Sequence, residues 1–485
     1  MWSCIGGSNN SGKAAPNLNA QLRQLIREHG LTGDPAKGRL LPSINDPLAQ
    51  LGMKLFFTKG LGGNMDAACV SCHHPVFGGS DGLSLPIGVD AVDPDLIGPG
   101  RLHQAGAHGF DGGPTVPRNS PATFNVALWD SSLFWDSRVE SLGKSAGFNG
   151  GDGYGIRTPD TPFGEADLMA GTNLAAAQSR FPVTSPEEMR AFTFEAGNDN
   201  TAVRDHLVAR LGDFGIGAGE LPGNTWLNEF QTAFSSSAGA EELITFERVV
   251  EAIGAYERSQ TFVDNPWKDF VEGDQNAISR SAKRGAILFF KPVEDGGAGC
   301  VQCHSGDFFT DEQHYNIAVP QVGRGKGDGG TGTDDFGRFR ETGQSEDMYA
   351  FRTPSLLNLA VSGPYGHSGA YTSLEAMVRH HLDVETAIAN YDTSQLDPTV
   401  QTGDWQVNSQ AALNDLLQKR VLGIQTVMNC VLNEQEFQDL MAFLDALNDP
   451  CVLDRQCLDP WIPDGSVSDP DGQRLNGKDQ FGQPL

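Results

Sequence analysis

Two short stretches decide the fold of this 485-residue chain: Cys69-Val70-Ser71-Cys72-His73 and Cys300-Val301-Gln302-Cys303-His304. In each stretch two residues separate a pair of cysteines, and a histidine directly follows the second cysteine. Thiols at this spacing can add to the two vinyl groups on one edge of a porphyrin, and the adjacent histidine can bind the iron as proximal ligand. With eight cysteines and 11 histidines in the chain, two chance copies are implausible. The stretches therefore predict two covalently bound haem c groups.

A zinc site is the alternative at each stretch, but zinc would need further ligands and would not favour a histidine directly after the cysteine. Covalent haem attachment occurs outside the cytoplasm, so we expect a periplasmic or otherwise extracytoplasmic protein. No hydrophobic signal region precedes Cys4, so the export signal is absent from this sequence. Cys4, followed by residues rich in Gly, Ser and Asn, is typical of a lipid anchor on a flexible tether, and a free thiol in a cloning remnant explains it equally well.

The charge of the chain limits its partners. A net charge of −28 disfavours nucleic acid and anionic membrane surfaces and would attract a basic electron-donor protein. The same acidity could serve solubility alone. No stretch approaches the roughly 20 apolar residues that span a bilayer, so we expect no membrane span.

Four of the eight cysteines lie outside the two haem stretches. Cys451 and Cys457 lie close together and predict a disulfide in an oxidising compartment. Cys430 could pair with either of them, and the sequence does not choose.

Helical patterns dominate and strand signals are few. We expect a mainly α protein with two cytochrome c-like haem domains, long irregular loops and little strand. The ranges with helical apolar spacing are Leu18–His29, Asn45–Phe57, Glu187–Phe194, Thr201–Leu211, Trp226–Phe234, Glu241–Glu257, Ser279–Phe290, Ser373–His381, Ser409–Leu422 and Glu434–Leu447.

A helix followed by a haem stretch occurs twice, which indicates an internal repeat at the level of domains. We place the boundary between the domains near Val263–Gln275. The expected division is a flexible N-terminal tether (1–16), an N-terminal haem domain (17–265), a C-terminal haem domain (266–450) and an extended C-terminal tail (451–485).

From about Asp46 to Leu447 the sequence resembles the bacterial di-haem cytochrome c peroxidases and their relatives, which include a methylamine-utilisation enzyme that oxidises a protein tryptophan and a di-haem rubber oxygenase. Together the matching blocks are specific, although any one alone would be weak. In family order they are the first haem stretch with Gly79-Ser80-Asp81-Gly82, Arg118-Asn119-Ser120-Pro121, Phe134-Trp135-Asp136-Ser137-Arg138, Pro182 to Met189, the second haem stretch, Phe309-Thr310-Asp311, Phe351-Arg352-Thr353-Pro354-Ser355-Leu356 and Pro364 to Glu375.

The resemblance implies roles around the first haem. His73 would be the proximal ligand of a peroxidatic haem, and Glu188 the distal acid/base. Gln178 would hydrogen-bond the bound oxygen species, and Pro182 would shape the same pocket. Trp135 would relay electrons between the haems.

Chemistry independently calls for such groups, because heterolytic cleavage of a peroxide requires a proton to move from the inner to the outer oxygen, and a carboxylate above the iron can move it. Without the resemblance, Glu188 in Ser185-Pro186-Glu187-Glu188 would be a helix-start carboxylate, and Trp135 a core aromatic.

Around the second haem the resemblance implies that His304 is the proximal ligand of an electron-transfer haem. A calcium ion between the domains would be bound by Asn119 and by the backbone carbonyls of Ser362 and Pro364.

Two departures from the family pattern matter. Many family peroxidases cap the first haem with a histidine sixteen residues past the proximal one, and here that position is Val89. Valine cannot bind iron, so the first haem should be open without reductive activation, although His103 or His108 could substitute. The family also places the sixth ligand of the second haem, Met or Tyr, fourteen residues after the histidine of the block at Pro364. Here that position is His381, which predicts a bis-histidine haem, with His380 as the fallback.

Three functions remain open. The first is a peroxidase that reduces hydrogen peroxide with electrons from a small donor protein, a cytochrome c or a cupredoxin, through the second haem. The second is an oxidase or oxygenase acting on a protein or other large substrate through a high-valent haem. The third is an electron carrier without catalysis, against which Val89 argues. Residues 137–178 form a longer insertion than expected, in which Asp160 or Glu165 would be the replacement acid if Glu188 is not catalytic. The oligomeric state stays open, with a homodimer as one option.

Overall fold

The computed structural model describes residues 17–424 and 429–485. The predicted tether (1–16) and the predicted lipid anchor at Cys4 lie outside the described residues. Helix accounts for 38% of the chain and strand for 6%, as the sequence predicts. The helices are α1 (Leu18–Glu28), α2 (Pro47–Phe57), α3 (Leu174–Gln178), α4 (Asn200–Gly212), α5 (Trp226–Ala233), α6 (Ala240–Leu243), α7 (Phe246–Ser259), α8 (Pro266–Glu272), α9 (Arg280–Phe290), α10 (Phe339–Thr342), α11 (Leu374–Leu382), α12 (Val384–Ala389), α13 (Trp405–Val421) and α14 (Glu434–Asp445).

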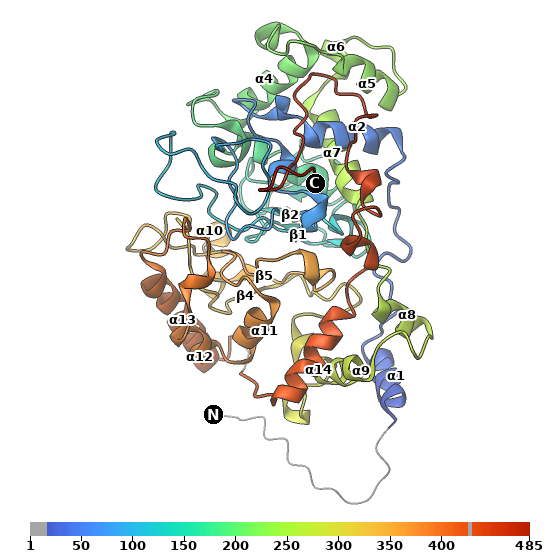
Figure 1. Cartoon of the computed structure of the whole chain (residues 1–485), viewed down its shortest axis with the longest axis vertical. Coiled ribbons are helices and arrows are strands. Elements are labelled where there is room, and N and C mark those ends of the chain that lie inside the picture. Colours follow the sequence, from blue (N-terminus) through green and yellow to red (C-terminus); the bar gives the residue numbers. More distant parts are fainter. Residues whose placement is uncertain (1–16, 425–428) are drawn as a thin grey trace, which may run out of the picture.

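The described strands are short and form two small antiparallel sheets. They lie near the middle of the molecule, between two groups of helices (Figure 1). One sheet has the order β1 (Ser132–Leu133), β2 (Val139–Ser141) and β3 (Ile156–Arg157), and the other pairs β4 (His314–Tyr315) with β5 (Phe351–Arg352).

A hydrophobic core built on α2 and α7 surrounds the first haem stretch. Val70 and Ala68 are buried in it together with Phe56. The two helices approach so closely that a Cβ on Gly52 of α2 would lie 1.9 Å from the backbone oxygen of Ala252 in α7. Only glycine is compatible with this crossing. The crossing fixes the position from which the chain enters the first haem stretch.

A second core repeats this arrangement around α9 and α14. Phe289, Phe290 and Phe443 are buried there, and Cys300 packs against them. A Cβ on Gly285 of α9 would lie 1.9 Å from the backbone oxygen of Asp439 in α14. Each haem stretch thus follows a helix that crosses its partner at a glycine, which is the structural form of the internal repeat.

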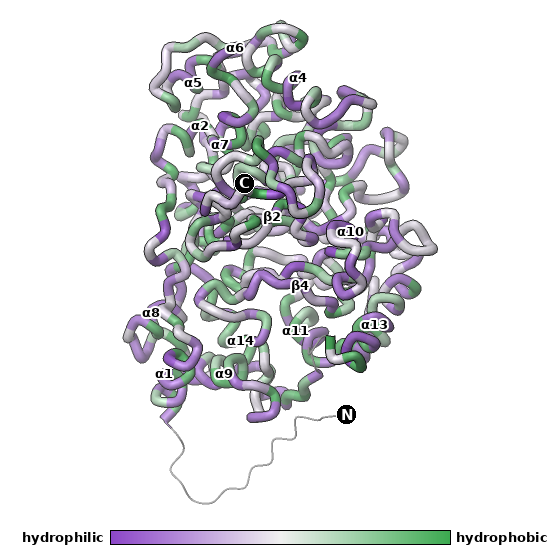
Figure 2. The backbone as a smooth tube through the Cα atoms, turned by 180° about the vertical axis from the view of Figure 1, so that it is seen from behind, coloured by the Kyte–Doolittle hydropathy of each residue, from purple (hydrophilic) through white to green (hydrophobic). Residues whose placement is uncertain are grey.

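The chain crosses between the two parts at both ends. Leu22 and Ile26 of α1 are buried in the second core, although the expected N-terminal domain begins at residue 17. The apolar face of α1 packs against α9, because α1 precedes a long loop (29–46) that lets it reach the other part. The C-terminal segment returns to the first core, where Leu475 is buried. Figure 2 shows this segment lying beside α2 and α7, with α1, α8, α9 and α14 grouped at the opposite end.

Most expected helices are present within one to four residues of their expected ends, and two are corrected. The range Glu187–Phe194 is not an α-helix but a single π-helical turn, Pro186–Arg190, followed by irregular chain. The range Glu241–Glu257 is broken into α6 and α7, because the Thr245 side chain accepts the Arg248 N–H and starts a new helix. The short helices α3, α8, α10 and α12 were not expected, since none is long enough to show a helical period.

The predicted disulfide between Cys451 and Cys457 is confirmed. Cys430 is buried beside the second core and has its sulfur 3.5 Å from the backbone oxygen of Gly297. In the described part of the chain no helix combines the length and the apolar character needed to cross a bilayer.

Candidate functional site: two linked cavities

A cavity of about 100 Å³ opens beside the first haem stretch and gathers most of the predicted catalytic residues. Cys69, Cys72 and His73 lie on it. The residues that the family resemblance assigns also line it, namely Asn119, Trp135, Gln178, Pro182 and Glu188. These positions span 120 residues of sequence, so their convergence on one cavity supports the assignment independently of any single motif.

Contacts at the Nδ1 atom fix the orientation of the His73 ring. Its Nδ1 lies 2.9 Å from the backbone oxygen of Gly79, and the Ser120 hydroxyl lies 3.2 Å from the same nitrogen. A hydrogen bond from Nδ1 to a carbonyl leaves Nε2 with its lone pair for a metal, which is the usual support of a metal-bound histidine. Burial lowers the pKa of His73, so the imidazole is neutral and able to bind iron.

Glu188 reaches the first cavity from the π-helical turn Pro186–Arg190. Such turns are rare and often occur at functional sites. Burial raises the pKa of Glu188, and the nearby cations Arg138 and Lys326 oppose this rise. Burial thus favours the protonated form of this carboxyl group.

A second buried acid lines the first cavity and was not identified from the sequence. Glu257 of α7 is 4% exposed, and one carboxylate oxygen lies 3.3 Å from the Ser179 hydroxyl. Burial raises the pKa of Glu257 to about 8. Sequence reasoning missed it because its helix has acidic residues throughout, and nothing in the spacing separates the inward one from the outward ones.

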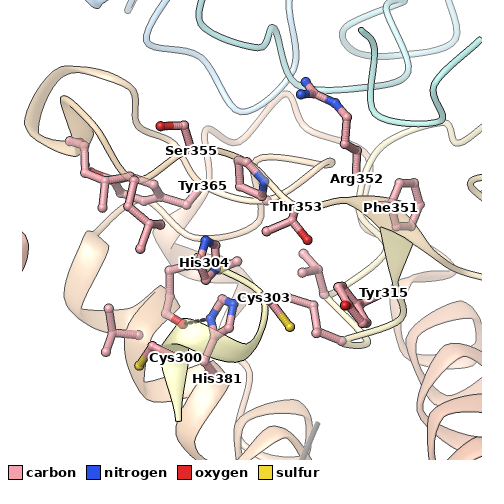
Figure 3. A pocket seen from close by; sticks show the side chains of 18 of the residues that line it. Cys300, Cys303, His304, Tyr315, Phe351, Arg352, Thr353, Ser355, Tyr365 and His381 are labelled. Carbon is pink, nitrogen blue, oxygen red and sulfur yellow. Dashed lines mark hydrogen bonds between the residues drawn. The ribbon is translucent and has the colours of Figure 1, made fainter. Parts of the chain in front are cut away.

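A larger cavity of about 300 Å³ lies beside the second haem stretch (Figure 3). Nδ1 of His304 lies 3.1 Å from the backbone oxygen of Phe309, which repeats the support of His73. The ring centre of His381 lies 6.4 Å from that of His304. Two imidazoles on opposite sides of one metal, each bound at about 2 Å, place their ring centres roughly 6 Å apart. Nδ1 of His381 lies 2.9 Å from the Met377 oxygen, so its Nε2 also stays available.

His380, the fallback ligand, is engaged elsewhere. Its Nδ1 lies 2.8 Å from the Tyr371 hydroxyl, and its Nε2 lies 2.7 Å from the backbone oxygen of Ile317. Both ring nitrogens are therefore occupied in the protein interior. The geometry favours His381 over His380 as the residue facing His304.

Trp135 and Asn119 line both cavities. The Trp135 indole N–H donates to the backbone oxygen of Asn119 at 2.9 Å. The tryptophan thus lies between the two haem stretches in a fixed orientation. Ser362 and Pro364 line the second cavity together with Asn119.

The residues present fit two haem c groups. Each cavity combines two cysteine thiols with one carbonyl-supported imidazole, and the second adds a facing imidazole. Arg352, whose side chain is shown in Figure 3, is buried on the second cavity with one guanidinium nitrogen left without a hydrogen-bond partner among the described residues. A buried cation in this state suits an acidic group of a bound molecule.

The replacements considered for the first haem lie away from the cavity. Val89 is buried in the first core. Among the described residues lining the first cavity, neither His103 nor His108 is present, because His103 stacks on Phe110 and His108 packs on Phe192. In the insertion, Asp160 pairs with Arg204 at 2.6 Å and with Arg180 at 3.1 Å, and Glu165 is exposed.

Comparison with known proteins shows which proteins the chain is similar to. Residues 46–276 match the sequence profile described as di-haem cytochrome c peroxidase. The methylamine utilization protein MauG of Methylorubrum extorquens is 27% identical over 385 residues, 79% of this chain and 80% of its own. The cytochrome c551 peroxidase of Pseudomonas aeruginosa is 25% identical over 336 residues, 69% of this chain and 71% of its own. The chain therefore resembles di-haem cytochrome c peroxidases over residues 46–276, and it is similar over more than two thirds of its length to proteins named MauG and cytochrome c551 peroxidase.

Solved structures share the fold. A MauG-like protein associated with microbial copper homeostasis matches with a TM-score of 0.53 and 21% identity, covering 90% of this chain and 97% of its own. The diheme peroxidase BthA of Burkholderia thailandensis matches with a TM-score of 0.52 and 20% identity, covering 91% of this chain and 92% of its own.

Proposed function

We propose that this protein is an oxidoreductase that reduces hydrogen peroxide at the first cavity with electrons received through the second. One observation carries the proposal: His73 shares its cavity with Glu188 and Gln178, whereas His304 is faced by His381. The first arrangement leaves a place for a small oxygen ligand beside an acid, and the second leaves none.

The residues of the first cavity would handle the protons of the reaction. Haem, when bound, supplies an iron that binds peroxide and exchanges electrons with it. Glu188 would take the proton from the inner oxygen of the peroxide and deliver it to the outer one, which departs as water. The raised pKa of Glu188 supports this role, since burial favours its protonated form. Gln178 would orient the peroxide from the end of α3, and Pro182 would limit the space around it.

Electrons would enter at the second cavity, where His304 and His381 would hold the haem iron, and Trp135 would lie between the cavities. Each cavity with its core corresponds in this proposal to one cytochrome c-like domain. A small electron-donor protein, a cytochrome c or a cupredoxin, would be the reductant, and the net charge of −28 would attract a basic one. The Cys451–Cys457 disulfide and covalent haem attachment both support a periplasmic or otherwise extracytoplasmic location.

A calcium ion bound by Asn119 and by the carbonyls of Ser362 and Pro364 belongs to the same proposal. All three residues are among those that line the second cavity, and amide and carbonyl oxygens are ligands that calcium accepts. The Asn119 amide nitrogen donates to the backbone oxygens of Leu83 and Ser84 at 3.0 and 3.2 Å, which orients its oxygen. Chelation followed by calcium titration should lower and then restore the rate of electron transfer between the haems. A rate unaffected by chelation would contradict the site.

The test of the proposal is peroxide-dependent oxidation of a reduced cytochrome c by the purified di-haem protein. We expect saturable turnover with one peroxide consumed for two cytochromes oxidised, and loss of turnover in Glu188→Gln. Absence of turnover with several reduced cytochromes and cupredoxins, in protein that carries both haems, would contradict it.

An oxidase or oxygenase of a large substrate is the second candidate. The insertion favours it, because Phe148, Tyr154 and Leu168 are 58%, 71% and 96% exposed, and exposed apolar side chains suit contact with another macromolecule. Peroxide consumption without a reduced donor, coupled to oxidation of an added protein, would distinguish this candidate from the peroxidase.

A further inference from the structure

We propose that Lys326, together with Arg138, binds the carboxylate side chains of the haem held by His73. A loop that follows the second haem stretch thereby closes the cavity of the first. This assignment requires the haem but not the peroxidase activity.

Lys326 and Arg138 form part of a cluster of three cations that lines the first cavity with Arg118. Arg118 is already neutralised by two buried aspartates. Its guanidinium donates to Asp335 at 2.6 and 2.8 Å and to Asp136 at 2.5 Å. Both aspartates therefore already have a cationic partner in Arg118.

Arg138 shares Asp136 with Arg118, at 3.2 Å. The Lys326 ammonium has no hydrogen-bond or ion-pair partner among the described residues, although its side chain is half-buried at the cavity wall. Three cations thus lie near Asp136 and Asp335, and Glu188 is a third carboxyl group near Arg138 and Lys326, with a pKa that burial raises. Burial and the neighbouring Arg118 and Arg138 together lower the pKa of Lys326 to about 8. An uncompensated positive charge at a cavity wall calls for an anion.

The proposal assigns these cations, which line one cavity with Cys69 and Cys72, to the acidic edge of the haem. The vinyl groups of the porphyrin are fixed by Cys69 and Cys72, and the propionates extend from the other side of the ring. Cys69 packs in the first core, with its sulfur 3.9 Å from that of Met189. The charges that act most on the two thiols belong to Glu257, Glu188, Asp81 and Arg101. Arg138 and Lys326 are not among them, although both act on Glu188 at the same cavity.

The loop that carries Lys326 is built to hold it there. Gly325 has φ +59°, and a Cβ at this position would lie 2.1 Å from the backbone oxygen of Thr333, so only glycine allows the turn. The Lys326 N–H donates to the Asp334 oxygen at 2.9 Å. Arg324, two residues earlier, donates to the Thr115 oxygen at 3.1 Å and pairs with Asp111. The loop is therefore fastened to the first half of the chain on one side of Lys326.

The test compares Lys326→Met with Lys326→Arg in the protein carrying both haems, by spectroelectrochemical titration of each haem. Loss of a cation beside the propionates favours ferric iron, so Lys326→Met should shift the reduction equilibrium of the first haem at least tenfold toward the oxidised form, 59 mV for one electron. The second haem should be unchanged, and Lys326→Arg should titrate as the wild type. An unchanged first haem in Lys326→Met, or equal shifts at both haems, would overturn the proposal.

A second experiment distinguishes the haem carboxylates from a carboxylate in solution as the ligand of Lys326 and Arg138. Wild-type protein titrated with acetate should show no saturable change in the spectrum of the first haem. A saturable change that disappears in Lys326→Met would assign the cluster to an external carboxylate and would overturn the assignment to haem. Haem content and thermal unfolding of both variants report folding separately, and failure of the peroxidase assay would leave these readouts intact.

Discussion

The two cavities are built from the same parts and differ in one wall. In both, a helix crosses its partner at a glycine, two cysteines follow, and a histidine has Nδ1 close to a backbone oxygen five or six residues further on. The opposite wall carries Glu188 and Gln178 in the first cavity and His381 in the second. Under the proposed function, the shared scaffold would hold each haem, and the wall that is not repeated would decide whether its iron can meet a substrate.

The walls that differ between the two cavities come from segments that have no counterpart in the other half of the chain. Glu188 lies on a π-helical turn that follows the long insertion, and His381 lies in the last turn of a regular helix, α11. A regular helix places its histidine rigidly, which suits a permanent ligand. The tight irregular turn instead directs a carboxyl group inward while its neighbour Glu187 bonds to Ser185.

The strongest test of this difference between the two cavities is Glu188→Gln, which keeps the size of the side chain but removes its ability to transfer a proton. The reaction of peroxide with the resting protein, followed by stopped flow, should slow by about 10²–10⁴-fold, while reduction of the second haem by donor stays normal. Glu187→Gln on the same turn is the matched control and should react as the wild type. A native rate in Glu188→Gln would make Glu188 a structural residue only.

Removing His381, the proposed iron ligand of the second cavity, should leave the second haem with an open position like that proposed for the first. His381→Ala should convert the second haem from low-spin to high-spin in the electron paramagnetic resonance spectrum, because one axial nitrogen is lost. His380→Ala should remain low-spin, since His380 contacts Tyr371 and Ile317 instead. The reverse result would move the ligand by one residue.

The wild-type protein allows a test with a smaller expected effect of the same difference between the two haems. The oxidised protein should bind cyanide at one of its two haems without prior reduction, because Val89 is buried in the first core and cannot bind iron. Optical titration should therefore saturate near one cyanide per chain. No binding, or binding only after reduction, would show that another residue caps the first haem.

The smallest expected effect concerns Glu257 and the pH. Its pKa is about 8 in the folded protein against an ordinary value of 4.5, so between these pH values the folded form keeps a proton that the unfolded form has lost. The free energy of unfolding then falls as the pH rises from about 4.5 to 8 and levels off above. Glu257→Gln should remove this dependence.

At pH 8, where one pKa unit is worth about 1.4 kcal/mol, we expect Glu257→Gln to be the more stable protein by about 1–4 kcal/mol in denaturant titrations. At pH 4 the two proteins should differ little. A difference that is the same at both pH values would mean that Glu257 is ionised in the folded state.

The sequence was most informative where chemistry imposes an exact spacing. The haem stretches, the Cys451–Cys457 disulfide and the long helices could be predicted, because each depends on neighbours in the chain. The roles of Gln178, Glu188 and His381 came from the family resemblance, and their assignment stays a prediction although the structure brings them to the expected cavities.

What the sequence could not predict depends on tertiary packing. The π-helical turn at 186–190 has the composition of an ordinary helix start, and only the surrounding chain decides its geometry. Glu257 and Lys326 carry no local signal of burial, since each lies among residues of similar polarity. The association of α1 with the second core could not be predicted from the sequence either, because an amphipathic helix does not specify its partner.

The crossing of the chain ends has a consequence for how the protein is made. A chain that emerges from its N-terminus onward exposes α1 long before α9, against which α1 packs, has emerged. The first core lacks Leu475 until nearly the whole chain is out, although its haem stretch appears early. Both haem stretches are thus accessible to the attachment machinery before either core is complete. Excising one half at the 265/266 boundary would leave that half without a piece of its own core, so each half should be produced only with the grafted segment that completes it.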